Sequence, residues 1–145
     1  MKVYISGKIG EDVISDATRE KFARAEKMLQ ERLSDLSSVV NPASEAFQET
    51  MDVDFQWRQI PKNLPDILLY DLQWLRTCDV IYMLDDWKQS DGANLELDYA
   101  RCTGMKIWWQ DEEDAKVFCD DPEKYEQEWI PIDGSDDTQR SLRFE

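Results

Sequence analysis

The chain has 145 residues, with 32 acidic side chains against 17 basic ones and no histidine, so its formal net charge is −15. This length is typical of one domain. The charge argues against a nucleic-acid polymer or an anionic membrane as partner, because both are bound mainly by Lys and Arg. The lack of histidine excludes Ser-His-Asp catalysis and imidazole-ligated zinc. Acid–base chemistry must then use carboxylates, Lys, Tyr or Cys.

Cysteine usage and hydropathy predict a cytoplasmic protein. Cys78, Cys102 and Cys119 are widely spaced and do not form a metal-type or redox-type pair, as expected of reduced thiols. The apolar run Val3–Ile5 is too short for a signal peptide, and no stretch reaches the ~20 apolar residues of a membrane span. We therefore expect no association with a membrane.

The first 40 residues predict a strand, a helix and a second strand. Lys2–Ser6 is rich in β-branched and aromatic residues and ends in a glycine turn, Gly7–Gly10. Ser15 is a suitable N-cap for an amphipathic helix to about residue 33. Val39 and Val40 form a short strand that stops before Asn-Pro.

Residues 43–63 show no clean hydrophobic period and are interpreted as one short helix and a loop. Their aromatic residues Phe47, Phe55 and Trp57 have two interpretations. They pack under a lid, or they stack on a base.

The second half continues the alternation of helices and strands. Helices are predicted at 65–77, where Pro65 is the first residue, and at 93–103, after Gly92. Strands are predicted at 79–84 and 106–109, with a possible fifth at 129–132.

This alternation predicts an α/β fold in three layers, with a parallel sheet of order 2-1-3-4 between helices. The α/β domain is assigned to residues 1–109. Residues 110–145 carry 13 acidic and 4 basic side chains and form an acidic extension, packed on this domain or trailing it. One helix is expected in the extension, at about residues 122–127.

Ligands of open parallel sheets bind at the carboxyl ends of the strands, where the strand order reverses. The loops that meet there are Gly7–Gly10 and Asp85–Gly92, and the second opens a helix, whose N-terminus suits an anion or sugar oxygens. Neither a P-loop nor a full dinucleotide fingerprint is present. Trp87 is interpreted as a pocket wall or as a loop anchor, and Asp85 and Asp86 as solvated loop acids or contacts to sugar hydroxyls.

Two acids interrupt the apolar stripes of predicted helices. Asp71 in helix 65–77 and Glu96 in helix 93–103 take positions that periodicity assigns to the core. Each acid either lies at the margin of its stripe, reaching water or an arginine, or belongs to a site.

As a pair, these acids would suit a glycosidic-bond site. Glu96, in the first turn of its helix, would be held ionised by the helix dipole, as a nucleophile requires. Asp71, set among leucines, would have a raised pKa and could protonate a leaving group. Retaining glycoside cleavage uses two carboxyls ~5 Å apart.

Four segments resemble the nucleoside 2-deoxyribosyltransferase superfamily, especially its 2'-deoxynucleoside 5'-phosphate N-hydrolase branch and uncharacterised phage and bacterial relatives. They are YISG at 4–7, DLQWL at 71–75, CDVIY at 78–82 and SDGANLE at 90–96. The resemblance covers roughly residues 2–109.

The resemblance implies a flavodoxin-like fold and cleavage of the N-glycosidic bond of a (deoxy)nucleoside or its monophosphate. Glu96 takes the place of the nucleophile and Asp71 that of the general acid. No metal and no cofactor is implied. A homodimer or larger homo-oligomer is implied, in which a neighbour completes the site.

The resemblance also implies roles for the two loops. Tyr4, Gly7 and Ile9 line the sugar and base side, whereas Ser90 and Gly92 hold a 5'-phosphate in the hydrolases; transferases carry an acid at the Ser90 position. The chain departs from the hydrolases in the first loop, where a serine and an arginine are replaced by Lys8 and Gly10. Lys8 could meet a phosphate as a point charge. Residues 43–63 have no counterpart in this pattern.

The leading hypothesis is a hydrolase or base-exchanging transferase that acts through a glycosyl-Glu96 intermediate. The main alternative is a nucleotide-binding or sensing module that kept the pocket without turnover. A third possibility is an interaction protein whose acidic extension engages a basic partner.

Overall fold

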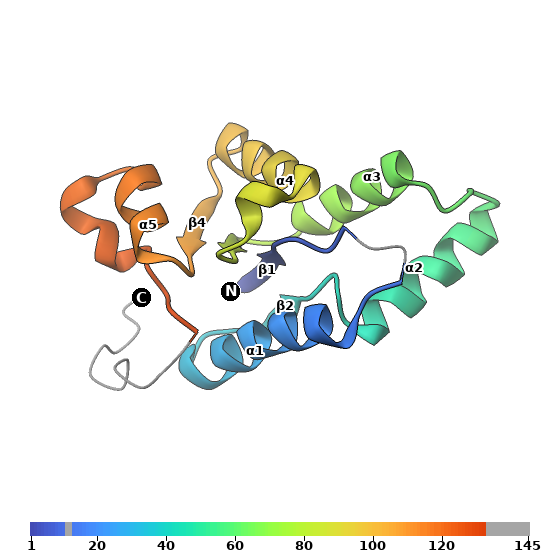
Figure 1. Ribbon diagram of the computed structural model, residues 1–145, viewed down its shortest axis with the longest axis horizontal. Coiled ribbons are helices and arrows are strands. Elements are labelled where there is room, and N and C mark those ends of the chain that lie inside the picture. The colour runs from blue at the N-terminus through green and yellow to red at the C-terminus, as the bar shows by residue number, and fades with distance from the viewer. Residues whose placement is uncertain (11–12, 133–145) are drawn as a thin grey trace.

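The computed structural model describes residues 1–10 and 13–132, and in them a four-stranded parallel sheet lies between helices (Figure 1). The strand order β2-β1-β3-β4 confirms the predicted flavodoxin-like α/β topology. Every neighbouring pair is parallel. The strands are β1 (Lys2–Ser6), β2 (Ser38–Val40), β3 (Val80–Met83) and β4 (Lys106–Trp109).

The helices begin where the sequence supplies a capping side chain. Each α-helix has an N-cap residue whose side chain accepts a backbone N–H of the first turn. The α-helices with their caps are α1 (Asp16–Arg32, Ser15), α2 (Glu45–Arg58, Ser44), α3 (Leu64–Leu75, Asn63), α4 (Asp91–Cys102, Ser90) and α5 (Glu112–Phe118, Asp111). Two 3₁₀ helices are η1 (Trp87–Gln89) and η2 (Pro122–Gln127).

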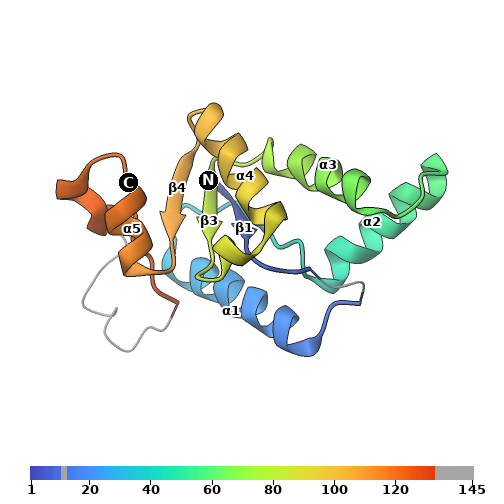
Figure 2. The same cartoon turned by 45° about the horizontal axis from the view of Figure 1, so that its top comes forward.

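The two faces of the sheet pack against different helices, because successive residues of a strand point to opposite sides. Val3 and Ile5 of β1 belong to a core cluster with α1, whereas Tyr4 belongs to a cluster with α3 and α4. Figure 2 shows the carboxyl ends of β1, β3 and β4 at one edge of the sheet, and the start of α4 beside it. This edge carries the predicted loops.

Three segments differ from the prediction. Residues 45–58 form one helix of 14 residues rather than a short helix and a loop. Residues 129–132 do not form a fifth strand in the described part of the chain, where Trp129 makes one isolated bridge to Trp109. The helix α5 was not predicted, because it has only seven residues and three of them are acids in its first turn.

The described part of the extension packs on the α/β domain. Ile130 is buried in the cluster beneath α1, and Ala115 of α5 is buried in the cluster on the other face. The predicted helix at 122–127 is present as η2. Residues 133–145 of the predicted extension lie outside the described residues. No helix within 1–10 and 13–132 is long and apolar enough to cross a membrane.

Candidate functional site

Glu96 is the centre of the candidate site. It is 6% exposed and lies in the second turn of α4, since that helix begins at Asp91 rather than at Ala93. The Tyr4 hydroxyl donates a hydrogen bond of 2.6 Å to Oε2, and the Ser6 hydroxyl donates one of 2.6 Å to Oε1. Both oxygens of this carboxylate are therefore held by hydroxyl groups from one strand.

The alternation of β1 explains this clamp. Tyr4 and Ser6 are two residues apart, so both side chains point to the face of the sheet that α3 and α4 cover. Both are buried, and the Tyr4 ring packs in the cluster on that face. Sequence analysis missed Ser6, although its position two residues after Tyr4, at the carboxyl end of a strand, was a usable signal.

Asp71 faces the same site from α3. It is 8% exposed, and its Oδ1 atom is buried without a hydrogen-bond partner among the described residues. Burial, together with the charge of the nearby Glu96, raises the pKa of Asp71 to about 8. The raised pKa predicted for Asp71 is confirmed in direction, with burial as the predicted cause.

The pKa of Glu96 is raised by burial to about 7, against the lowering effect of the hydrogen bonds from Ser6 and Tyr4. This differs from the prediction that the helix dipole holds Glu96 ionised. A dipole acts mainly within the first turn, and Glu96 lies beyond it. The two hydroxyl donors favour the charged form instead.

Among residues 1–10 and 13–132, no cation is seen to compensate the charge of the pair. No ion pair between residues that the structure describes includes Asp71 or Glu96. In the described part of the chain neither acid pairs with an arginine, and both are largely buried, which argues against the interpretation of each as an acid at the margin of its stripe. Two buried carboxyls whose charges interact cannot both ionise cheaply, so the pair retains a proton near neutral pH.

Tyr4 is uncharged at this site. Burial and the charges of Glu96 and Asp71 raise the pKa of Tyr4 well above its usual value. The phenol therefore acts as a hydrogen-bond donor to Glu96 rather than as an acid. A hydrogen bond thus joins the predicted site residues Tyr4 and Glu96, and the charge of Asp71 also acts on Tyr4.

Gly7 packs tightly against the end of β3. A Cβ atom at this position would lie 2.7 Å from Leu84 Cδ1 and 2.9 Å from Leu84 Cβ. Only glycine allows the chain to leave β1 at this closeness to its neighbour. The next residues in the loop differ in environment, since Lys8 is exposed and Ile9 packs against the cluster on the α1 face.

Ser90 and Gly92 begin α4. The Ser90 hydroxyl accepts the Ala93 N–H at 3.1 Å and so serves as the N-cap. Gly92 lies inside the first turn, where a Cβ would be 3.2 Å from Leu68 Cδ2 of α3. Both residues thus position the helix that carries Glu96.

Trp87 is a structural anchor. It is 5% exposed, its ring contacts the rings of Trp109 and Phe118, and its indole N–H donates to Asp114 Oδ2 at 3.1 Å. These contacts agree with the loop-anchor interpretation, and none of them is to the carboxylate pair.

The aromatic residues of 43–63 separate into two environments. Phe47 and Phe55 make edge contacts with Tyr70 of α3, while Trp57 is 88% exposed. Phe47 and Phe55 therefore join α2 to the helix that carries Asp71.

The arrangement resembles an acid–base pair more than a metal centre. Among residues 1–10 and 13–132, no group of three or more Cys, Asp and Glu side chains could hold a metal ion. One carboxylate is fixed by two donors, and the other has an unpartnered oxygen. Such a pair can supply one nucleophile or base and one acid.

Comparison with known proteins identifies one family. A family model described as a domain of unknown function (DUF4406) matches residues 1–109. No curated protein and no solved structure matches the chain. The matched segment contains the whole sheet and all the residues of the site described above.

Proposed function

The chain belongs to the DUF4406 family, and we propose that it cleaves the N-glycosidic bond of a (deoxy)nucleoside or nucleoside monophosphate. One observation carries the proposal: a buried pair of carboxyl groups, in which Glu96 is clamped by two hydroxyls and Asp71 has an oxygen without a partner. The resemblance to nucleoside 2-deoxyribosyltransferases supports the assignment of roles.

The proposed first step uses both acids. A Glu96 carboxylate oxygen forms a bond to the anomeric carbon while the bond from that carbon to the base nitrogen breaks. The electron pair of the broken bond stays on the nitrogen, and the protonated Asp71 delivers its proton to the base. The raised pKa of Asp71, about 8, supports its role as an acid at neutral pH.

The second step releases the sugar. The Asp71 carboxylate takes a proton from water, or from the nitrogen of a second base, and this acceptor attacks the anomeric carbon. The bond to Glu96 breaks, and the carboxylate is regenerated. Water as acceptor makes the protein a hydrolase, and a base makes it a transferase. Neither route requires a metal or a cofactor.

The substrate contacts expected for Tyr4, Gly7, Lys8, Ile9, Trp87, Ser90 and Gly92 remain predictions. For Tyr4 and Ser90, the contacts described above support a positioning role: one holds the nucleophile and the other caps its helix. We also propose assembly into a homodimer or larger homo-oligomer. Apolar side chains exposed on α2 and α3 support this, and they are Val53, Trp57, Leu64 and Leu69.

Release of free base tests the proposal. The protein is incubated with the four common deoxynucleosides, the ribonucleosides and their 5'-monophosphates, and the base is measured by chromatography. Glu96→Gln is expected to lower the rate by several orders of magnitude, because no other side chain substitutes for the nucleophile. Glu20→Gln, an exposed acid of α1, is the matched control. Equal release by wild type and Glu96→Gln would refute the mechanism.

A further inference from the structure

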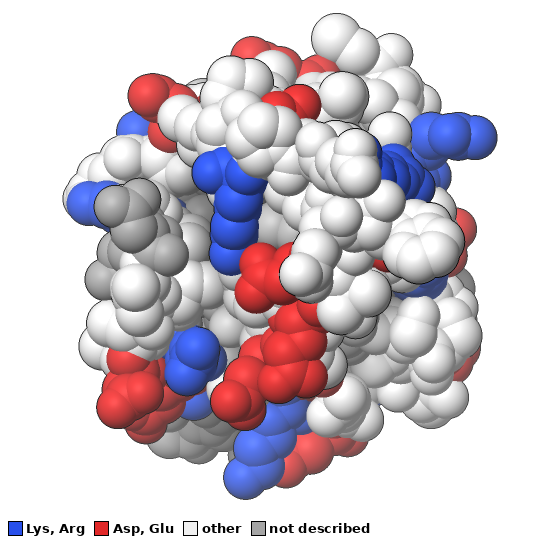
Figure 3. Space-filling model, turned by 90° about the vertical axis from the view of Figure 1, so that its right-hand side faces the viewer, with Lys and Arg blue, Asp and Glu red and all other residues white. Residues whose placement is uncertain are grey.

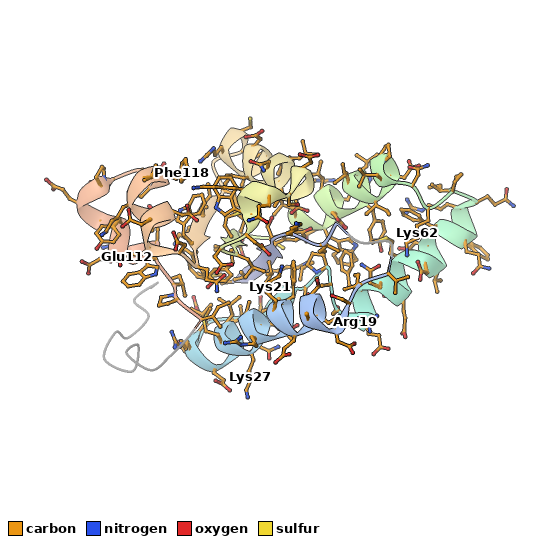
Figure 4. All side chains as sticks on the ribbon, viewed as in Figure 1. Arg19, Lys21, Lys27, Lys62, Glu112 and Phe118 are labelled. Carbon is orange, nitrogen blue, oxygen red and sulfur yellow. The ribbon has the colours of Figure 1, made fainter. Side chains whose placement is uncertain are left out.

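Both backbone polar groups of Lys8 are bound by side chains. The Lys8 N–H donates to Asp86 Oδ1 at 3.0 Å, and the Lys8 carbonyl accepts from Lys21 Nζ at 2.9 Å. Lys21 also forms an ion pair with Asp86 Oδ2. Figure 4 shows Lys21 on the side of α1 towards the sheet, whereas Lys27 points away from it. We call the set of Lys8, Lys21 and Asp86 the loop clasp.

The loop clasp is connected to the carboxylate pair through the ends of β1 and β3. Lys8 follows Ser6, a donor to Glu96, by two residues. Asp86 follows Leu84 by two residues, and the Leu84 N–H donates to the Ser6 carbonyl at 2.8 Å. Because Asp86 is paired with Lys21 and only partly exposed, it is not the solvated acid that its loop position predicted. Its side chain is 21% exposed and that of Lys21 is 28% exposed.

A phosphate at a glycine loop binds backbone N–H groups and a nearby cation. In the loop clasp, one Asp86 oxygen accepts the Lys8 N–H, and the other is paired with the Lys21 ammonium. Asp86 therefore makes the contacts that a phosphate would make. The Asp86 carboxylate also places a negative charge at this loop, and this charge would repel a phosphate that approaches it.

Two other donors near the loop are engaged or weak. In the first turn of α4, the Ala93 N–H is bound by Ser90 Oγ. The Lys8 side chain remains at the loop, but it is exposed, and an exposed lysine attracts an anion only weakly at physiological salt.

We propose that Asp86 is a specificity-determining residue, which takes the place of a substrate phosphate and restricts the site to nucleosides without a 5'-phosphate. The inference rests on the proposed function, since it concerns the substrate of the same site. Lys21 is a positioning residue in this arrangement, because it acts through Asp86 and the Lys8 carbonyl.

The test compares binding and base release for each deoxynucleoside and its 5'-monophosphate, by calorimetry and by chromatography. Wild type is expected to bind the nucleosides at least about tenfold more tightly than the monophosphates, the factor that one contact of moderate strength supplies. Asp86→Asn keeps the size of the side chain but removes its charge, and it leaves the Lys21 ammonium free for a phosphate. This variant is expected to shift the ratio about tenfold or more towards monophosphates.

Two further variants serve as comparisons. Asp85→Asn removes the same charge from an exposed neighbour and is expected to keep the wild-type ratio. Lys21→Met leaves the Asp86 charge uncompensated and is expected to shift the ratio further towards nucleosides. It also tests the inference if Asp86→Asn does not fold, as judged from its thermal unfolding.

Equal binding of monophosphates and nucleosides by wild type would overturn the inference. The same holds if Asp86→Asn folds and keeps the wild-type ratio, or if Lys21→Met shifts the ratio towards monophosphates. Tight nucleoside binding without base release would contradict the proposed function but leave the role of Asp86 supported. Base release that favours monophosphates would support the proposed function but contradict the role of Asp86. If none of these compounds binds, both the proposed function and the inference about Asp86 are contradicted.

Discussion

Tyr4 and Glu96 are separated by 92 positions in the chain, and the Tyr4 hydroxyl donates a hydrogen bond of 2.6 Å to Glu96 Oε2. The bond joins the first strand to α4, and Ser6 makes the equivalent bond to the other oxygen. Both donors favour the ionised carboxylate, whereas its burial opposes ionisation. The reactivity of Glu96 therefore depends on β1 as much as on α4.

Removal of one hydroxyl tests this dependence. Tyr4→Phe or Ser6→Ala is expected to raise the pKa of Glu96 further, because the hydrogen bonds lower it. The acidic limb of the kcat/KM profile should move to higher pH, with a loss of about 10- to 100-fold below pH 7. Part of the activity should return as the pH is raised.

The full pH–rate profile gives the readout. A purely structural role for the two hydroxyls predicts a uniform loss at every pH, with no displaced limb. That result, from variants whose thermal unfolding matches wild type, would contradict the clamp as a determinant of ionisation. Because Asp71 and Glu96 titrate as a coupled pair, the limbs of the pH–rate profile are assigned to the pair and not to either residue alone.

Asp71 predicts a pH-dependent stability. An aspartate has an ordinary pKa of 3.8, and the folded value is about 8. The folded state therefore holds a proton that the unfolded chain releases. The resulting stabilisation is complete below about pH 4 and is lost as the pH rises towards 8. Asp71→Asn has no carboxyl group to ionise, so this loss of stability at high pH is not expected in the variant.

Urea unfolding at pH 5 and pH 8.5 measures the effect. Asp71→Asn is expected to have a free energy of unfolding about 1–3 kcal/mol above wild type at pH 8.5, with a smaller difference at pH 5. Asp66→Asn, at a half-buried acid in the first turn of the same helix, is the matched control and should follow wild type. A variant that is less stable than wild type at pH 8.5 would argue against an unpaired, buried carboxylate.

Gly7 is expected to tolerate no side chain. Gly7→Ala would place a Cβ 2.7 Å from Leu84 Cδ1, and the loop would have to move away from the end of β3. We expect a loss of about 1–3 kcal/mol in the free energy of unfolding. Gly92→Ala is the comparison, since its Cβ, inside a helix, would meet the end of the flexible Leu68 side chain at 3.2 Å and Ser90 Oγ at an ordinary contact distance of 3.8 Å. Equal losses at the two sites would contradict the account of Gly7.

The apolar residues exposed on α2 and α3 predict self-association. Trp57 is 88% exposed, and Figure 3 shows the end of the molecule that includes α2, where acidic and basic side chains are interspersed among uncharged ones. In sedimentation experiments wild type is expected to have at least twice the mass of one chain. Trp57→Glu should lower that mass, because exposed apolar groups of this size mark interfaces.

Val117→Glu provides the control for this prediction. Val117 is 67% exposed on α5, at the other end of the molecule (Figure 1), so a charge there should leave the mass unchanged. A wild type that remains monomeric over the concentration range would contradict the assembly. So would dissociation by Val117→Glu alone.

The fold was largely predictable because strands and caps leave local signals. Apolar runs marked the four strands, and Ser15 marked the start of α1. The helix α2 was not recognised at its full length, because only Met51 and Phe55 of its residues are buried. Its single buried stripe lies mainly against α3, so its apolar period is weak.

The site was predictable in part, for a different reason. Asp71 and Glu96 were found because an acid in an apolar stripe is a local anomaly. Ser6 was missed although its alternation with Tyr4 was a local signal. The ion pair of Lys21 with Asp86 was not found, since it depends on contact between residues far apart in the chain. Periodicity places a side chain on one face of a helix or strand, but it does not identify the residue that the side chain contacts there.

The stereochemistry of methanolysis tests the central claim, that Glu96 attacks the anomeric carbon. A deoxynucleoside is cleaved in buffer that contains methanol, and the configuration of the methyl 2-deoxyriboside is determined by NMR. Two displacements through glycosyl-Glu96 predict retention, so a β-nucleoside should give the β-methyl glycoside, and Glu96→Gln should give none. The α-methyl glycoside from wild type would show direct attack by the acceptor and would contradict a nucleophilic Glu96.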